Sequence, residues 1–249
     1  MSSQVVRTIS FSGIDGAGKT TQIEELCAAM EEKGLQVRLI RFWDDIAQFT
    51  QFRESAGHKL FKGDKGIGSP TAPIHRKDKN VRFWPMAVVR LFLYLADSFA
   101  LRNFMRIARS SGADVIVFDR FIYDELANLN LSNPVMRWYA QCIMRYVPRP
   151  TISFLLDADP ETARARKPEY PVDFIRVNRA AYLKLSGMIG GMTIIYPNTV
   201  REVSREIAAR VFGVLQVAQL ESRPTPASPK PISERAAKLD GQIADPASS

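Results

Sequence analysis

The sequence predicts an α/β fold with a mainly parallel sheet, and two observations carry this prediction. Short apolar runs alternate with longer helical segments, which is the pattern of strands joined by crossover helices. The first apolar run, 5–12, leads directly through a glycine-rich stretch into a helix. Hydrophobic residues make up 46% of the 249 residues, which is enough for a sizeable core.

Each expected strand is a short, mostly apolar run, in the order 5–12, 35–42, 113–118, 151–156 and 192–196. Helices are expected at 19–33, 44–53, 84–110, within 121–147, at 171–187 and at 199–220. Gly34 and Gly112 follow two of these helices and would close them in the left-handed conformation. Asp159 before Pro160 fits an N-cap followed by proline at the first helical position, so another helix opens there.

Two segments lack the periodicity of helices or strands. Residues 55–82 are rich in Gly, Pro, Lys and Ser, and predict a long basic loop. The window 53–82 holds eight Lys or Arg and three acidic residues, a net charge of +5. Residues 221–249 hold five prolines and few large apolar residues, so we expect one domain over 1–220 followed by a disordered tail.

Charge and composition narrow the class of protein. The net charge of +8 is compatible with nucleic acid, a membrane surface or phosphorylated small molecules. No nucleic-acid motif accompanies the basic loop, so it faces either a phosphate or solvent, and we expect no nucleic-acid partner. The most apolar helix candidate, 86–108, contains Arg90, Asp97, Arg102 and Arg106, which is too charged for a membrane span. A cytoplasmic protein follows, in which Cys27 and Cys142 are structural thiols rather than a disulfide.

The strongest motif is Gly13-Ile14-Asp15-Gly16-Ala17-Gly18-Lys19-Thr20-Thr21, a phosphate-binding loop of the form G-x-x-x-x-G-K-[ST]. Its glycines let the backbone amides approach a phosphate closely. Lys19 reaches the β- and γ-phosphates of a nucleotide, and the Thr20 hydroxyl can ligate Mg²⁺. The helix that opens at Lys19 adds the positive end of its dipole. The loop therefore predicts binding of ATP with Mg²⁺.

A second constellation follows the buried run 115–118. Asp119 and Arg120 stand at the carboxyl end of this expected strand, the edge where open α/β sheets bind ligands. Asp119 can hold Mg²⁺ or its water shell opposite the phosphate loop. The planar fork of Arg120 suits a second phosphate. A structural ion pair is the alternative interpretation.

With these motifs the chain resembles the thymidylate kinase family of nucleoside monophosphate kinases, over about residues 5–215. The resemblance rests on four segments: the phosphate loop 11–21, the Asp-Arg-aromatic motif 119–121, and the segments 156–166 and 173–183 on either side of a lid. It implies the P-loop fold, a five-stranded parallel sheet wrapped by helices, with a lid at about 160–175. It also implies that the protein is a phosphotransferase with a small nucleotide substrate.

The resemblance assigns roles to individual residues. Asp15 matches the acid that contacts the acceptor sugar, and Arg120 matches the arginine that grips the acceptor phosphate. Because this phosphate loop has no arginine, the lid should supply the catalytic cation, with Arg166 first, and Arg164 and Lys167 as alternatives. Such a cation would neutralise charge on the transferring phosphoryl group. Surface charges on an amphipathic helix are the alternative interpretation of these cations.

The acceptor side departs from the family pattern. Where the family carries Phe-Ala-Ala-Asp-Arg-x-Gln, this chain has Leu95-Ala-Asp97-Ser98-Phe-Ala100 preceded by Tyr94. Ser98 and Ala100 cannot supply the base contacts of Arg and Gln, although Tyr94 can stack on a base and Arg90, one turn away, can address the same pocket.

Three functions stay open at this point. The first is phosphorylation of a deoxynucleoside monophosphate, with conversion of dTMP to dTDP foremost. The second is a kinase for a different phosphorylated or hydroxyl acceptor, and the third is a nucleotide-binding switch or scaffold with little transfer. Family members often pair as homodimers, and Leu91, Phe92, Phe99 and Phe104 are candidates for such a face; burial inside the molecule explains them equally well.

Overall fold

The computed structural model describes residues 6–47, 84–108 and 112–221. The basic loop expected at 55–82 and the tail expected from 221 onward lie outside the described residues, apart from residue 221 itself. The strands are β1 (Arg7–Ser12), β2 (Val37–Arg41), β3 (Val115–Asp119), β4 (Ile152–Leu156) and β5 (Met192–Ile195). The helices are α1 (Lys19–Glu31), η1 (Phe42–Ile46), α3 (Trp84–Ala108), α4 (Ile122–Leu126), α5 (Pro134–Tyr146), α6 (Pro160–Arg166), α7 (Val172–Ile189) and α8 (Val200–Glu221).

The five strands form one parallel sheet in the order β2-β3-β1-β4-β5, which confirms the predicted fold class. In this register Phe11 of β1 lies between Asp119 of β3 and Phe154 of β4. Because parallel strands end at the same edge of a sheet, the segments after β1, β3 and β4 meet there. The sheet order thus brings the two sequence motifs together.

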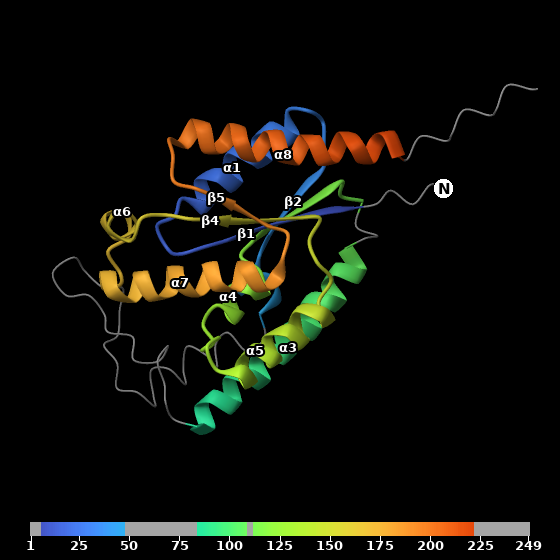
Figure 1. Ribbon diagram of the computed structural model, residues 1–249. Coiled ribbons are helices and arrows are strands. Elements are labelled where there is room, and N and C mark those ends of the chain that lie inside the picture. Colours follow the sequence, from blue (N-terminus) through green and yellow to red (C-terminus); the bar gives the residue numbers. More distant parts are fainter. Residues whose placement is uncertain (1–5, 48–83, 109–111, 222–249) are drawn as a thin grey trace, which may run out of the picture. The chain divides into compact units, whose positions relative to one another are not determined.

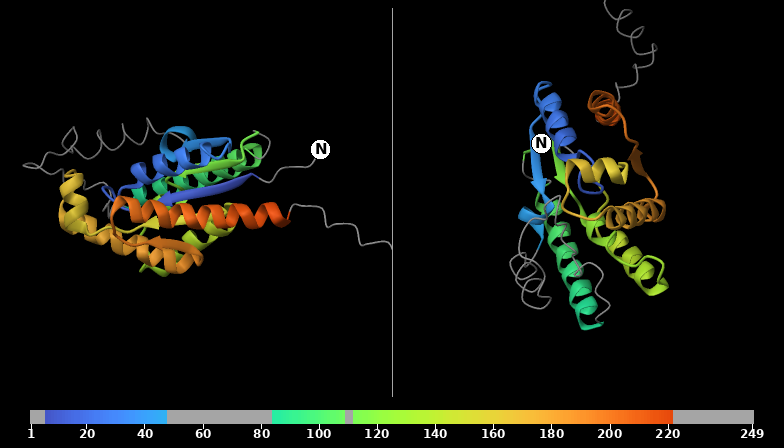
Figure 2. Two further views of the ribbon diagram at one scale, coloured as in Figure 1. Left: turned by 90° about the horizontal axis from the view of Figure 1, so that it is seen from above. Right: turned by 90° about the vertical axis from the view of Figure 1, so that its left-hand side faces the viewer.

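Helices cover both faces of this sheet (Figures 1 and 2). α1 packs against β1, β2 and β3 on one face, and α3, α4, α5 and α7 lie on the other. On the α1 side, the first part of α8 adds Ser204, whose Oγ donates to Gln22 Oε1 at 2.8 Å. Because helices cover both faces of the sheet, β3 and β4 are nearly continuous runs of buried apolar residues.

Phenylalanines fill the core directly beneath the site. Phe11 and Phe154 stack with ring centroids 5.2 Å apart, and Phe118 meets Phe121 edge-on at 5.4 Å. All four rings are fully buried. Since Phe121 follows Arg120 in the chain, its burial anchors the turn that presents the arginine.

Several expected element ends are confirmed. Gly34 and Gly112 have positive φ angles of 78° and 76°. Asp159 caps α6, accepting a hydrogen bond from the Thr162 amide at 2.9 Å, with Pro160 at the first helical position. The expected helix at 44–53 differs: the structure has a short π-helical turn, η1, closed by the Ala47 amide on the Phe42 carbonyl at 2.8 Å. Residues 48–53 lie outside the described part.

The chain divides into two compact units, 1–212 and 213–249, with the boundary inside α8. The sheet and all the site residues discussed below belong to the first unit. Among the described residues, no helix combines the length and apolar character that a bilayer crossing requires.

Candidate active site

The phosphate loop joins β1 to α1 and has the backbone of an anion cradle. Gly13, Gly16 and Gly18 have φ angles of 142°, 83° and 86°, a region that side chains rarely allow. Gly18 is the N-cap of α1, which has no side-chain cap and no acidic residue in its first turn. The helix start is therefore left for an external anion, because its first amides have no intrahelical acceptor.

Two glycines are required for packing as well as for turning. A Cβ at Gly13 would overlap the Leu156 carbonyl oxygen at the end of β4, and one at Gly16 would overlap the Ala163 carbonyl oxygen of α6. The loop is thus pressed between the sheet edge and α6. This contact places the helix that the sequence assigned to the lid directly against the phosphate loop.

Lys19 curls back over its own loop. Its Nζ donates to the carbonyl oxygens of Gly13 at 2.8 Å and Ile14 at 2.9 Å. Burial, and then the neighbouring charge of Arg120, lower the pKa of Lys19 to about 8, against the opposing pull of nearby carboxylates that include Asp15. The ammonium is thus held against the backbone of the phosphate loop by two carbonyl oxygens.

Arg120 turns out of the end of β3 in an unusual backbone conformation. It is the one non-glycine residue with a positive φ, 68°, in the described part of the chain, and its amide donates to the Phe11 carbonyl at 3.0 Å. Its guanidinium forms an ion pair with Asp15 of the phosphate loop. Burial alone would lower the pKa of Arg120, but the charges of Asp124 and then Asp15 raise it above its usual range. The two motifs are joined by a direct contact.

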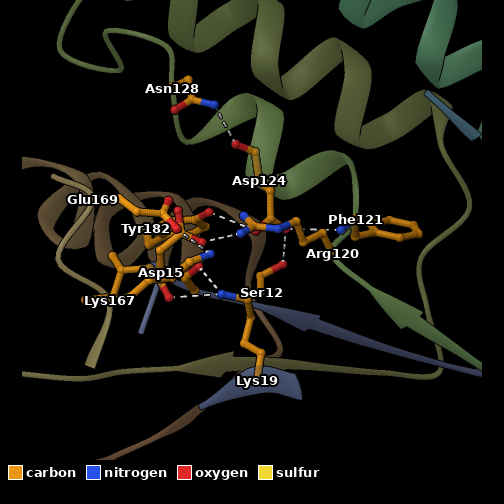
Figure 3. A network of polar contacts seen from close by, with 12 residues as sticks. Ser12, Asp15, Lys19, Arg120, Phe121, Asp124, Asn128, Lys167, Glu169 and Tyr182 are labelled. Atoms are coloured by element: carbon orange, nitrogen blue, oxygen red, sulfur yellow. Dashed lines mark hydrogen bonds and ion pairs between the residues drawn. The ribbon is translucent and has the colours of Figure 1, made fainter. Parts of the chain in front are cut away.

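The polar network extends to residues that sequence reasoning missed (Figure 3). Asp124 of α4 lies 3.5 Å from Arg120 Nη1 and accepts hydrogen bonds from Ser12, Phe121 and Tyr182. Its position four residues after Arg120, in the short helix that follows the Asp-Arg motif, was the available signal. Tyr182, 58 positions further on, had no such local signal.

The expected metal ligands sit at the same sheet edge. Thr20 is exposed in the first turn of α1, and Asp119 is half-buried at the end of β3. One hydroxyl and one carboxylate are a donor set that suits Mg²⁺, which usually keeps several waters and shares phosphate oxygens. Thr21, next along α1, is exposed as well.

The lid cations differ in how closely they approach the loop. Arg166 Nη1 lies 3.5 Å from the Gly16 carbonyl oxygen, whereas Lys167 pairs with Glu169 at 3.4 Å. Arg164 is half-buried on α6 and, within the described residues, has no hydrogen bond or ion pair. The structure therefore brings Arg166, the first choice from the sequence, to the phosphate loop.

The acceptor candidates of α3 lie beside α4. Tyr94 is only 5% exposed and belongs to the main apolar core, and Arg90 is half-buried one turn before it. Ser98 is fully buried, and its hydroxyl donates to the Tyr94 carbonyl at 2.6 Å. The helix positions of Arg90 and Tyr94 agree with the expected spacing, while their roles toward an acceptor stay predictions.

A second feature that the sequence did not reveal lies where the chain enters the segment that the resemblance assigns to a lid. Arg179 of α7 grips Asp157 with two hydrogen bonds of 2.6 Å, from Nε to Oδ1 and from Nη2 to Oδ2. Asp157 follows β4 and precedes α6, so the pair joins the segment entering the lid to the helix leaving it. No short-range pattern links positions 22 apart, so the pair had no signal in the sequence.

Comparison with known proteins agrees with this geometry, although no family model matches the chain. A protein named "Probable thymidylate kinase" from Methanosphaera stadtmanae is 26% identical over 181 residues, covering 71% of this chain and 82% of the relative. A protein of the same name from Pyrococcus abyssi is 27% identical over 212 residues, covering 82% of this chain and 94% of the relative. The "Thymidylate kinase" of Chlorobaculum parvum is 30% identical over 168 residues, covering 64% of each chain. The chain is therefore similar to thymidylate kinases over most of its length and is a phosphotransferase of the nucleoside monophosphate kinase type.

Proposed function

We propose that this protein uses ATP and Mg²⁺ to phosphorylate a deoxynucleoside monophosphate, with dTMP as the first acceptor. One observation carries the proposal: the donor loop and the strand-end arginine meet through the Asp15–Arg120 ion pair. A reaction between two phosphates needs two anion-binding centres within one site, and the contact between the loop and Arg120 supports this arrangement. The names of the relatives support thymidylate as the acceptor.

The donor half fits ATP. Loop residues 13–18 and the uncapped start of α1 would hold the phosphates, and Lys19 would exchange its two carbonyl partners for phosphate oxygens. Thr20, with Asp119 behind it, would hold Mg²⁺, which would offset charge on the donor phosphates. Lys19 and the loop amides fix the donor in position.

The acceptor half begins at Arg120. Its planar guanidinium suits the phosphate of a nucleoside monophosphate, and Asp15 would turn from the arginine to the acceptor sugar. Arg166, beside the Gly16 carbonyl, would neutralise charge on the phosphoryl group in transit. These residues position the reactants and spread charge without covalent chemistry.

A different acceptor is the second candidate, and one observation favours it. The Ser98 hydroxyl, at a position where the family reads the base, is fully buried and bonded to its own helix at 2.6 Å. Loss of base-edge hydrogen bonds reduces discrimination among acceptors by orders of magnitude. If no other group replaces that contact, acceptors besides dTMP would enter the site.

The test is acceptor-dependent ADP release with ATP and Mg²⁺, screened against dTMP, dUMP, the other nucleoside monophosphates and no acceptor. Stimulation by dTMP above the others supports the proposal, and stimulation by another acceptor alone supports the second candidate. ATP binding without any stimulation would instead point to a switch or scaffold.

The matched variants are Lys19→Ala and Lys33→Ala, near opposite ends of α1. Lys19→Ala should lower kcat on the order of 10²–10³-fold or more, because it removes charge at the donor phosphates. Lys33→Ala should leave turnover unchanged, because the Lys33 ammonium lies over the Phe212 ring at 5.0 Å and not at the phosphate loop. Full turnover in Lys19→Ala would refute the mechanism.

A further inference from the structure

A buried carboxylate supports the arginine that faces the acceptor. Asp124 is 2% exposed, and both of its oxygens are engaged. Oδ2 accepts from Ser12 Oγ at 2.7 Å and from the Phe121 amide at 3.0 Å. Oδ1 accepts from the Tyr182 hydroxyl at 2.8 Å and faces Arg120 Nη1 at 3.5 Å.

The donors on Asp124 come from three separate parts of the fold. Ser12 ends β1, Phe121 precedes α4, and Tyr182 belongs to α7 (Figure 3). A carboxylate held from three directions cannot rotate, and its buried oxygens are satisfied without any ligand. The direction in which Asp124 faces Arg120 is therefore fixed by the fold and does not change when the guanidinium moves.

The two carboxylates on Arg120 are not equivalent. Asp15 pairs with Nη2 from the phosphate loop and is partly exposed, and under the proposed function it must turn to the acceptor. Asp124 faces Nη1 from the protein interior, and its side chain is 1% exposed. When Asp15 leaves, Asp124 is the partner that remains.

Both ends of Arg120 are then fixed before the acceptor arrives. The backbone is held at φ 68° by the Phe11 carbonyl, and the guanidinium by Asp124. Fixing a long side chain in advance removes an ordering cost from binding. The Arg120 guanidinium is thus already oriented to bind the acceptor phosphate.

We propose that Asp124 is a positioning residue that orients the Arg120 guanidinium, and that the Tyr182 hydroxyl holds Asp124 in place from the helix that leaves the lid. The inference rests on the proposed role of Arg120 at the acceptor phosphate. Tyr182 stays a donor because burial, and then the charge of Asp124, raise its pKa well above the usual range. The chain thereby connects α7 to the acceptor site through one hydroxyl and one carboxylate.

The experiment compares Asp124→Asn, Tyr182→Phe and the matched control Tyr123→Phe in the full chain. Tyr123 is a buried neighbour of Asp124 on α4, but its hydroxyl bonds to Ser153 of β4. One readout is the ¹⁵N spectrum of the Arg120 guanidinium, assigned with Arg120→Lys. The other is the set of kcat and KM values for acceptor and for ATP.

In the unsubstituted protein the Nη1 and Nη2 groups of Arg120 should give separate signals, because rotation of a held guanidinium is slow. In Asp124→Asn these signals should move toward each other, because the Asp15 pair alone then holds the guanidinium. The acceptor KM should rise about 10-fold or more, since a charge-assisted contact is lost. The ATP KM should stay within about twofold. Tyr182→Phe should raise the acceptor KM about 3–5-fold, and Tyr123→Phe should change neither readout.

Unaltered Arg120 signals in Asp124→Asn would overturn the inference, as would equal rises in both KM values with a lowered Tm. If Asp124→Asn does not fold, Tyr182→Phe decides by the same two readouts, because it removes a single oxygen. If no acceptor stimulates ADP release in the unsubstituted protein, the proposed function fails separately. The guanidinium spectra then decide whether Asp124 orients Arg120.

Discussion

Gly16 is the residue at which the phosphate loop and α6 come closest. Its φ is +83°, and a Cβ there would overlap the Ala163 carbonyl oxygen. Gly34 has a similar φ, +78°, but a Cβ at that position would have no atom within 4 Å. The two positions share backbone strain and differ only in the steric obstacle.

We therefore expect Gly16→Ala to lower the free energy of unfolding by about 2–4 kcal/mol, the sum of left-handed strain and overpacking against backbone. Gly34→Ala should cost about 1 kcal/mol, from strain alone. Urea denaturation of both variants measures the difference. Equal losses would mean that α6 moves away from the loop at little cost.

Cys27 on α1 gives a prediction about pH. Burial, and then the charge of Glu31, raise the pKa of its thiol from 9.0 to about 11. Since the thiolate is the reactive form, alkylation at pH 8 should be roughly 100-fold slower than for a thiol with the unshifted pKa. The rate should climb about tenfold per pH unit up to about pH 11. Mass spectrometry after timed iodoacetamide treatment of a Cys142→Ser variant measures this rate.

The same shift affects stability with a definite sign. Between about pH 9 and 11 the unfolded thiol loses its proton while the folded thiol keeps it, so the free energy of unfolding contributed by Cys27 falls as pH rises. If the rate of Cys27 alkylation levels off near pH 9 instead, the raised pKa of the thiol is contradicted.

The site residues form two groups: those that belong to short sequence motifs, and those that meet their partners only through contacts between distant parts of the chain. The phosphate loop 13–21 and the pair Asp119-Arg120 are short-range motifs with a mechanical reason for each position, and the sequence was enough to find them. Asp124 and Tyr182 act through a contact between α4 and α7. That contact depends on the packing of the two helices, so no spacing rule could predict it.

Among the elements, α6 and α7 show a clear contrast between buried and exposed ion pairs. Arg179 and Asp157 form a two-pronged pair in which the Asp157 side chain is 3% exposed. Arg176, three residues earlier on α7, pairs with Glu161 and Asp173, and all three side chains are more than half exposed. A buried carboxylate that loses its partner is costly, whereas an exposed pair contributes little.

Arg179→Ala should therefore lower the free energy of unfolding by about 2–3 kcal/mol, whereas Arg176→Ala should leave it almost unchanged, because its ion pairs are exposed to solvent. Chemical denaturation of the two variants provides the measurement. Comparable small losses would show that the segment after β4 is held by packing instead.

The strands and long helices were predictable because their periodicity and end signals agree. Gly34, Gly112 and the Asp159–Pro160 cap lie where the pattern expects them. The π-helical turn at Phe42–Ile46 could not be predicted, because its geometry depends on a hydrogen bond of 2.7 Å from the Arg41 amide to the Asp45 carboxylate. A single side-chain contact of this kind leaves no periodic trace.

For the whole molecule, the apolar face of α3 bears on assembly. Phe92 is 72% exposed and Phe99 is also exposed, whereas Leu91 and Phe104 are partly buried against the core. Val88 and Leu95 continue the exposed stripe at helical spacing. Two of the four residues proposed from the sequence thus remain available to a second copy of the chain.

We expect the protein to form a homodimer through this face, and Phe92→Glu to shift it toward the monomer. A charge in an apolar interface must be desolvated without a partner, which weakens association by several kcal/mol. Sedimentation equilibrium of the unsubstituted and variant proteins at matched concentrations tests this. A monomer in both cases, or a dimer in both, would assign the stripe another role.

The parallel sheet also determines where the molecule tolerates change. The phosphate loop, Asp119-Arg120 and Asp157 lie at or directly after the carboxyl ends of β1, β3 and β4, while the turn at Gly34 joins α1 to the opposite end of β2. That turn has open space around it. A fluorophore or affinity tag inserted there would follow nucleotide binding from a distance, and the reacting groups would keep their native surroundings.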